Sequence, residues 1–442
     1  MASLPLLGPY RERLAANPNM ALAFANTGWL LGDKVVRLGV GLVVNVWIAR
    51  ALGPSEFGLL SYTLALTGVL SAVATMGLPE LLVRDLVREP ERAQTIVASA
   101  LALRLAGALL ALILAVATAL VARPDEPRAV LLSAMLGAGQ FAVAMDVVDQ
   151  RFQAMSNVRS IVLIRNAVFG LFALLKIAAL LLHATVGIFA LLITMELITV
   201  AASLYWRARH QGLRFGLLHI CTVECRRLFH QAWPLLLRLL AIGVYMRLDQ
   251  VLIGQMLGDR AVGIYAAAGR ASEIWHLAPA SLLLALAPQL TLRHQRSTVD
   301  YENRIVTLFR AFLAVSIMVG IFFSVCSPWI IRELYGSRFI EAAPVLAIHV
   351  WAGVFVAFGI VANNWLINMG LIRVALYQAL IAASVSIGLN LIMIPVFGII
   401  GAAFSLVVSQ CMSGLLLNAV FPATRPLFRL QCRALGLAAA KR

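Results

Sequence analysis

Charged residues are scarce in this sequence, and their scarcity excludes most classes of soluble protein. Only 13% of the 442 residues are charged, whereas 62% are hydrophobic. A soluble domain carries roughly 25% charged residues. The composition therefore indicates a chain whose main solvent is lipid rather than water.

Cysteines and catalytic motifs are also sparse. The five cysteines are an odd number, and Cys221 and Cys225 form an isolated C-x3-C pair. Two histidines near this pair, His219 and His230, have unsuitable spacing for a zinc site. The sequence contains no G-K-[ST] phosphate loop, no H-E-x-x-H motif and no G-x-S-x-G motif. We therefore expect no metal, no cofactor, no disulfide framework and no enzymatic activity.

Long apolar runs, by contrast, are abundant. A helix needs about 20 predominantly apolar residues to cross the hydrocarbon core of a bilayer, and stretches of that length recur along the chain. A membrane barrel would show short alternating segments instead. We therefore predict an all-α integral membrane protein with about 12 transmembrane helices. The predicted spans are residues 24–49, 58–81, 95–122, 129–150, 160–182, 187–206, 234–257, 263–290, 305–331, 344–367, 374–396 and 398–421.

The distribution of lysine and arginine predicts the orientation of these helices. With the N-terminus in the cytoplasm, the cytoplasmic segments hold 21 of these residues and the outside segments hold 6. Cytoplasmic loops carry the excess of positive charge in membrane proteins, so both termini are predicted to be cytoplasmic. The net charge of +16 then reflects topology and contact with anionic lipid rather than a nucleic-acid partner. The six outside residues are Arg50, Arg123, Arg128, Arg260, Arg332 and Arg338.

A weak internal repeat divides the chain into two halves. The segment 48–58 resembles the segment 253–263 at an offset of 205 residues, with the pattern Leu-Gly followed by a second glycine in both. Each half holds six spans, so the halves share one orientation, and two such lobes around a central cavity are typical of a transporter. The predicted division is a six-span lobe at 1–206, a basic cytoplasmic linker at 207–233, a six-span lobe at 234–421 and a basic cytoplasmic tail at 422–442.

Ionisable residues inside the predicted spans are the strongest functional signal. Nine lysines and arginines and five acids lie at membrane depth, and each buried charge costs about 2.5–3.5 kcal/mol. These residues must therefore face a wet cavity, an opposite charge or the membrane interface. Because five acids cannot neutralise nine cations, we predict a central cationic cavity, which suits an anionic substrate.

We assign these residues by predicted role. The predicted substrate-binding cations are Lys34, Arg37, Arg165, Arg238, Arg247 and Arg270. The predicted coupling or release acids are Asp33, Asp249 and Glu273. The alternative for any single member is a structural ion pair, such as Arg270 with Glu273, because residues three or four apart meet on a helix. Arg165 has a further alternative, in which its side chain extends to the cytoplasmic interface.

Four short blocks, in order along the chain, resemble the polysaccharide transporter family of the multidrug/oligosaccharidyl-lipid/polysaccharide exporter superfamily. The blocks lie at residues 49–58 with 76–84, 247–270, 335–344 and 390–403. The resemblance implies a flippase that moves a polyprenyl-pyrophosphate-linked oligosaccharide across a bacterial cytoplasmic membrane by alternating access. It also implies work alongside polysaccharide polymerase and assembly proteins, in O-antigen or capsule biosynthesis.

The resemblance also implies where the head group binds. Related lipid II flippases use basic residues on spans 1, 2 and 8, and here spans 1 and 8 match, whereas span 2 has no basic residue before Arg84. Those relatives have fourteen spans, so a count of twelve favours an O-antigen or capsule transporter. Two other functions stay open, a cation-coupled multidrug exporter and a membrane glycosyltransferase, polymerase or ligase. Membrane glycosyltransferases, polymerases and ligases usually carry a large outside loop. The longest outside loop predicted here has about a dozen residues, which argues against such an enzyme.

Overall fold

The computed structural model describes residues 18–155, 158–210, 219–276, 279–283, 286, 290 and 297–437, and within these residues the regular structure is helical, with no strand. The first half contains α2 (Pro18–Thr75), α3 (Pro79–Arg88), α4 (Ala93–Ala122), α5 (Pro127–Ala144), α6 (Val147–Ala154), α7 (Val158–Leu181) and α8 (Val186–His210). The second half contains α9 (Thr222–Met256), α10 (Asp259–Glu273), α12 (Thr298–Tyr335), α13 (Ala342–His349), α14 (Ala352–Asn368), α15 (Ile372–Cys411), α16 (Leu417–Val420) and α17 (Arg425–Ala434).

Two of these helices are each two spans joined at a glycine. Helix α2 breaks at Gly53, which has φ 74° and ψ 174°, and α15 breaks at Gly398, which has φ 59° and ψ −141°. Glycine adopts such angles without a steric penalty. Among the described residues, eight helical stretches are long and apolar enough to cross a membrane, and two of them contain these breaks. With the more polar α9 and α10, the arrangement confirms an all-α membrane protein of about 12 helices.

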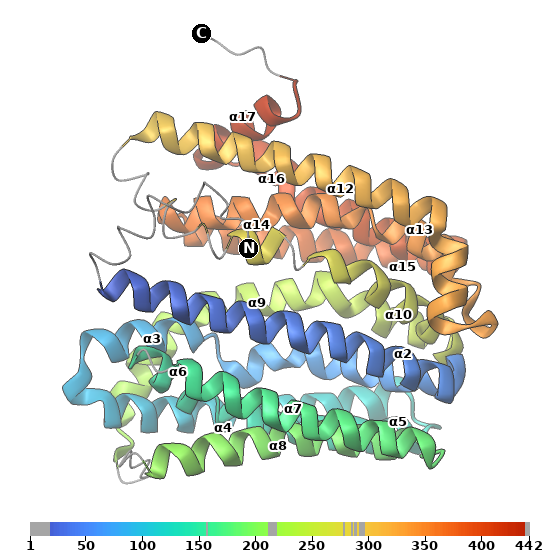
Figure 1. Cartoon of the computed structure of the whole chain (residues 1–442), viewed down its shortest axis with the longest axis horizontal. Helices are drawn as coiled ribbons and strands as arrows, with labels where there is room; N and C mark the ends of the chain where they lie inside the picture. Colours follow the sequence, from blue (N-terminus) through green and yellow to red (C-terminus); the bar gives the residue numbers. More distant parts are fainter. Residues whose placement is uncertain are drawn as a thin grey trace, which may run out of the picture.

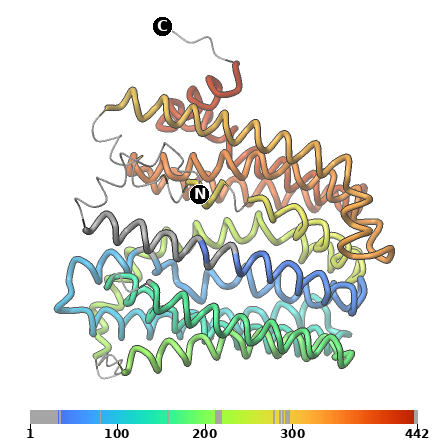
Figure 2. Tube along the Cα trace, viewed as in Figure 1, coloured from blue at the N-terminus to red at the C-terminus, as the bar shows by residue number. Residues whose placement is uncertain are grey.

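The helices form two lobes that meet along α2, α9 and α10. Figure 1 shows α4 to α8 on one side of α2 and α12 to α17 on the other, with α9 and α10 between the two groups. Helix α2 packs against α4, α5 and α7 in its own lobe and against α9 and α10 across the interface. The colours of Figure 2 follow the same division, with blue to green in one lobe and yellow to red in the other.

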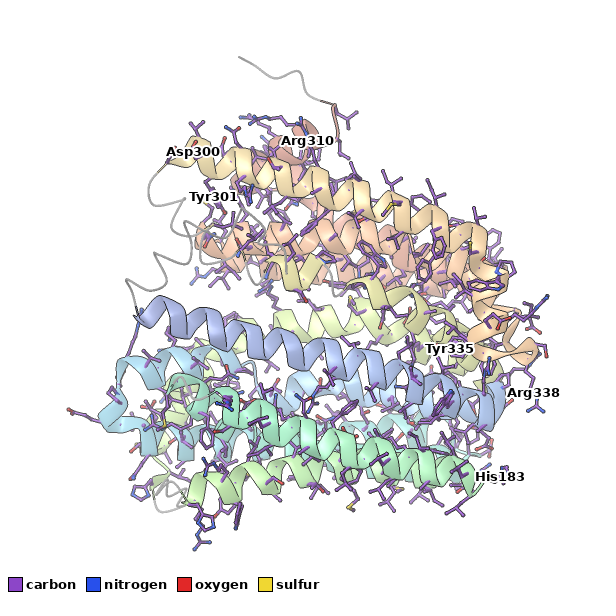
Figure 3. All side chains as sticks on the ribbon, viewed as in Figure 1. His183, Asp300, Tyr301, Arg310, Tyr335 and Arg338 are labelled. Carbon is purple, nitrogen blue, oxygen red and sulfur yellow. The ribbon has the colours of Figure 1, made fainter. Side chains whose placement is uncertain are left out.

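The loops between the helices lie at two opposite ends of the molecule. Figure 3 places His183, Tyr335 and Arg338 at one end of the helices and Asp300 and Tyr301 at the opposite end. The sequence predicts Arg338 outside and the segment before residue 305 inside. These two segments therefore lie at opposite ends of the helices, and which end is cytoplasmic stays a prediction.

The internal repeat predicted from the sequence is confirmed by the backbone. Gly258 has φ 83° and ψ 176°, nearly the angles of Gly53. The two glycines are 205 residues apart, which is the offset of the sequence repeat. Both sit at the turn that joins the first two spans of a lobe, so the two halves fold alike at this point.

Two segments predicted as basic linker and tail contain more helix than expected. Within the predicted linker 207–233, α9 already begins at Thr222, and Leu228 is buried against the apolar side of α3. Within the predicted tail 422–442, α17 buries Leu427 and Leu430 in the core of the second lobe. An apolar residue every three or four positions gives such a helix one side that packs, despite the arginines on the other.

Candidate functional site

A cavity of about 380 Å³ lies between the lobes, where α2 faces α10. From α2 it is lined by Arg37, Leu38, Gly39, Gly41, Leu42 and Asn45, and from α10 and the following turn by Arg270, Glu273 and Ile274. We call this the interlobe cavity. The structure thus brings together three residues that the sequence predicted as site residues from two distant spans, Arg37, Arg270 and Glu273.

Arg270 crosses from α10 to α2 and binds neutral groups there. Its guanidinium donates to Asn45 Oδ1 at 2.9 Å and to Ser61 Oγ at 3.3 Å. The guanidinium carbon also lies 4.6 Å from the ring centroid of Phe57, a cation–π distance. No ion pair within 4 Å joins Arg270 to Glu273 in the described part of the chain, so the alternative of a direct pair between them is wrong for this conformation. Contacts with α2 orient the arginine instead.

Of two further predicted cations, Arg37 lines the interlobe cavity and Arg247 is not among the residues that line it. The guanidinium carbon of Arg37 lies 5.4 Å from the ring centroid of Phe169 on α7. Arg247 extends from α9 over Gly68 of α2, where a Cβ on the glycine would lie 3.2 Å from Arg247 Cδ. The charges of Arg247 and Arg270 both act on the carboxylate of Glu273. The carboxylate of Glu273 therefore interacts electrostatically with at least two arginines.

Arg165 and Asp249 are not among the residues that line the interlobe cavity. Arg165 pairs with Asp149 at 2.5 Å and with Asp146 at 3.2 Å, both within the first lobe. The buried carboxylate of Asp249 accepts hydrogen bonds from the Tyr265 hydroxyl and from its neighbour's backbone N–H at 2.7 Å. In this conformation both residues make structural contacts within their own half of the chain.

The remaining predicted site residues have different outcomes. Arg238 lines a second cavity, inside the second lobe, where it donates to Asn363 Oδ1. Asp33 and Lys34 belong to the helical backbone of α2, but their side chains lie outside the described part of the structure. Their roles stay predictions.

One residue that the sequence analysis assigned only to the outside loops joins the lobes. Arg123, just after α4, is 7% exposed and lies with its guanidinium carbon 4.0 Å from the ring centroid of Tyr62. It pairs with Asp259 at 2.5 Å and donates to the carbonyl of Gly254 at 2.7 Å, both in the second half of the chain. Burial alone would lower the pKa of Arg123, but the hydrogen bond and charge of Asp259 outweigh it and raise that pKa above its ordinary value. A buried loop arginine has no sequence pattern, so only the folded chain identifies it.

At the opposite end, α3 binds the start of α9 through charged groups. Arg227 pairs with Glu224 at 2.5 Å and with Asp85 at 3.2 Å, and Arg84 donates to Gln231 at 2.9 Å. A cavity of about 810 Å³ opens beside these residues; we call it the cytoplasmic cavity, after the predicted topology. Its charged lining residues are Arg84, Asp85, Arg88, Glu89, Arg227 and Arg373. The four arginines outnumber the two acids.

Comparison with known proteins identifies the family and the fold. A family model described as "Polysaccharide biosynthesis protein" matches residues 23–291, more than half of the chain. No curated protein matches the sequence. This family match confirms the resemblance to polysaccharide transporters that the four sequence blocks indicated.

Solved structures with the same fold are membrane transporters of low sequence identity. The lipid II flippase MurJ in an inward closed conformation has 14% identity and a TM-score of 0.70, over 92% of this chain and 90% of that one. An inward-facing multidrug resistance MATE family transporter of the MOP superfamily has 14% identity and a TM-score of 0.69, over 92% and 96%. A MOP superfamily transporter from Pyrococcus furiosus, whose binding pocket is described as having reverse polarity, has 15% identity and a TM-score of 0.64, over 93% and 96%.

Proposed function

Because this chain belongs to the polysaccharide biosynthesis protein family, we propose that it is a flippase for polyprenyl-pyrophosphate-linked oligosaccharide repeat units. It would carry the head group from the cytoplasmic to the outer leaflet of a bacterial cytoplasmic membrane, for surface polysaccharide biosynthesis, with both of its own termini in the cytoplasm. The observation that carries this proposal is the interlobe cavity, in which Arg37 and Arg270 face each other from the two lobes.

The contacts of Arg270 suit a transient anionic ligand. Its partners Asn45 and Ser61 are neutral, whereas a pyrophosphate oxygen carries the opposite charge and adds coulombic attraction to each hydrogen bond. A pyrophosphate oxygen therefore competes well for the same N–H groups. Guanidinium groups also bind phosphate through two parallel hydrogen bonds, which fixes orientation as well as affinity.

The lipid tail has a place beside the same cavity. Val36, Leu38, Val40 and Val43 on α2 are between 41% and 48% exposed, and Leu38 also lines the interlobe cavity. Exposed apolar side chains on a spanning helix face hydrocarbon. A head group bound to the arginines can thus keep its polyprenyl chain in the bilayer next to α2, without burying that chain in the protein.

Alternating access requires contacts between the lobes that break in turn. At the outside end these are the contacts of Arg123 with Asp259 and Gly254. At the cytoplasmic end, α3 binds α9 through Asp85 and Arg227. We propose that the outside contacts open when the head group is released, and that Glu273 then attracts the arginines and resets the cavity.

A cation-coupled drug exporter shares the fold but not the charge of the cavity. The two lining arginines outnumber the one lining acid, and a positive excess repels cationic drugs. The geometry therefore favours the flippase over this alternative.

The test is complementation. The chain is expressed in a strain that lacks its own repeat-unit flippase, and surface glycan is measured with Arg37→Ala and Arg270→Ala variants. We expect wild type to restore the glycan and each variant to reduce it roughly tenfold or more. Such a reduction corresponds to the loss of one hydrogen bond to a charged group, about 1.5–3 kcal/mol. Arg260→Ala is the matched control, because Arg260 is exposed and pairs only with exposed Glu341 among the described contacts. Full activity in both cavity variants at normal protein level would refute the role of the cavity.

A further inference from the structure

The second cavity, inside the second lobe, has a volume of about 230 Å³ and is separate in its lining from the interlobe cavity. Four helical segments surround it: α9, α14, the first half of α15, and the end of α15 with the π-helical turn Met412–Leu416. We call it the lobe cavity. It is lined by Arg238, Ile242, Tyr245, Met246, Val356, Gly359, Ile360, Ala362, Asn363, Leu366, Ala375, Gln378, Ala379, Gln410, Ser413 and Gly414.

The charge of the lining selects against cations. Arg238 is the one ionised group among the described residues that line the lobe cavity, and none of them is acidic. Its guanidinium donates a hydrogen bond to Asn363 Oδ1. An anionic ligand therefore finds a complementary charge at this position.

The neutral polar groups around Arg238 suit hydroxyl groups. Gln378, Gln410 and Asn363 have side-chain amides with two donors and an acceptor each. Gln378 Nε2 donates to Asn418 Oδ1 at 3.0 Å, and Asn363 Oδ1 accepts from Arg238. The Nε2 of Gln410, 5% exposed, donates at 3.0 Å to the Met246 sulfur, a weak acceptor that a hydroxyl oxygen can replace. Tyr245 shares a hydrogen bond with Ser413. Such paired donors and acceptors bind sugar hydroxyls, which need both.

One wall of the lobe cavity is a π-helical turn. The π-helical turn Met412–Leu416 carries Ser413 and Gly414 into the lining, and π-helical turns often occur at functional sites. A Cβ at Gly414 would clash with the carbonyl oxygen of Phe355 on α14. Only glycine therefore allows the turn to approach α14 so closely.

Neighbouring residues of α9 and of α15 line the lobe cavity and the cytoplasmic cavity. On α9, Leu235 lines the cytoplasmic cavity and Arg238 lines the lobe cavity, which is less than one helical turn. At the start of α15, Val374 lines the first and Ala375 the second.

Size decides between a bare ion and a larger ligand. At about 230 Å³, the lobe cavity exceeds the roughly 30 Å³ share of one water molecule several times over, which leaves a monatomic ion loosely held. It is smaller than the roughly 300–1,000 Å³ of sites for drug-sized ligands. Apolar side chains such as Ile242 and Ile360 also line it, and these suit the C–H face of a sugar ring.

We propose that the lobe cavity is a subsite for one carboxylated sugar of the transported oligosaccharide, with the carboxylate on Arg238 and the hydroxyls on the surrounding amides, Ser413 and Tyr245. This inference rests on the proposed flippase function and adds a substrate class to it, namely repeat units that contain an acidic sugar.

The test measures binding of a free sugar to the purified full-length protein, independently of transport. Glucuronate, glucose and sodium phosphate are titrated at matched ionic strength, and binding is followed by ligand-detected NMR and by the shift in Tm. We expect glucuronate to bind at least tenfold more tightly than glucose. Arg238→Gln should remove that preference, and Arg260→Gln should leave it unchanged, because Arg260 is exposed and pairs with the exposed Glu341. Gln410→Met should weaken both sugars, because it removes an amide but keeps the size of the side chain.

Each outcome decides the inference. Equal binding of glucuronate and glucose by the wild type overturns it without any variant, even if Arg238→Gln fails to fold. Full displacement of glucuronate by phosphate at equal concentration also overturns it, because it leaves an inorganic-anion site. Absence of glucuronate binding, with surface glycan still restored by the wild type, overturns the subsite and leaves the flippase standing. Arg238-dependent glucuronate binding without complementation refutes the flippase, and with it the assignment of the cavity to a transported oligosaccharide, and leaves only a binding site for an acidic sugar.

Discussion

Gly58 and Gly263 face each other where α2 crosses α10, each packed against the backbone of the other's helix. A Cβ on Gly58 would clash with the carbonyl oxygen of Asp259, and one on Gly263 with the carbonyl oxygen of Pro54. The two glycines are 205 residues apart, and so are Pro54 and Asp259. Residues related by the internal repeat thus contact each other reciprocally, and the two lobes meet through equivalent surfaces.

This contact predicts the effect of one added methyl group. Gly58→Ala should open the outside end, because overpacking costs about 1–3 kcal/mol, enough to lower the closed population by roughly tenfold. The measurement is labelling of a cysteine at Leu42, in the interlobe cavity, by a membrane-impermeant thiol reagent from outside. The control is Gly170→Ala, since a Cβ there meets nothing within 4 Å. Equal labelling rates in both variants would contradict a closing role for Gly58.

The buried contact of Arg123 with Asp259 predicts a second route to outward opening. Removing one partner of a buried pair costs about 3–5 kcal/mol, so Arg123→Gln should increase outside labelling of the same cysteine strongly. The matched control is Arg260→Gln, whose pair with Glu341 is exposed on both sides and contributes about 0–1 kcal/mol. If the two substitutions increase labelling alike, the Arg123 contact is not a closure between the lobes.

Glu273 provides a test of head-group release. Arg247 and Arg270 both act on its charge, so Glu273→Gln should leave the arginines freer for phosphate. We expect the variant to bind the lipid-linked head group as tightly as wild type or more tightly, yet to flip it more slowly. Reconstituted vesicles with an imposed potential report both quantities. Weaker binding in the variant would show that Glu273 supports the cavity structurally, and Glu341→Gln is the control for loss of an exposed acid.

The pair of Lys176 with Glu196 predicts stability rather than transport. The two groups meet at 2.6 Å and are 13% and 15% exposed. Lys176→Met leaves the Glu196 carboxylate without this partner, at a cost of about 3–5 kcal/mol, whereas Lys176→Met with Glu196→Met replaces the pair by apolar contact and is close to neutral. The Tm in detergent should therefore fall in the single variant and recover in the double one. A double variant as unstable as the single one would mean that packing, not charge, is what the substitution disturbs.

The candidate site shows where sequence reasoning succeeds. The cost of burying a charge in a span predicted that Arg37 and Arg270 face the interior of the protein, and both line the interlobe cavity. Helical periodicity is local, so it determines which side of a helix a residue occupies. It does not determine which residue of a distant helix lies opposite.

The sequence therefore did not predict which residue each buried arginine contacts. Arg270 and Glu273 are three residues apart, yet Arg270 instead contacts Asn45, Ser61 and Phe57 of α2. Arg165 was assigned to the substrate cavity, and the structure pairs it with Asp149 inside the first lobe. For an arginine on the inner face of a span, the sequence offers several acids as possible partners. Only the packing of the helices in the lobe determines which one it contacts.

By itself, the sequence determined the membrane class, the number of spans, the repeat and the cationic excess, because each depends on runs of apolar residues or on counts of charge along the chain. Only the tertiary structure decided which charges neutralise one another, that Arg123 joins the lobes and that Arg238 lies in a cavity of its own. These depend on contacts between different segments of the folded chain, such as Arg123 with Asp259 and Arg238 with Asn363. The strength of a buried charge interaction depends on distance and burial, and neither exists before the helices pack.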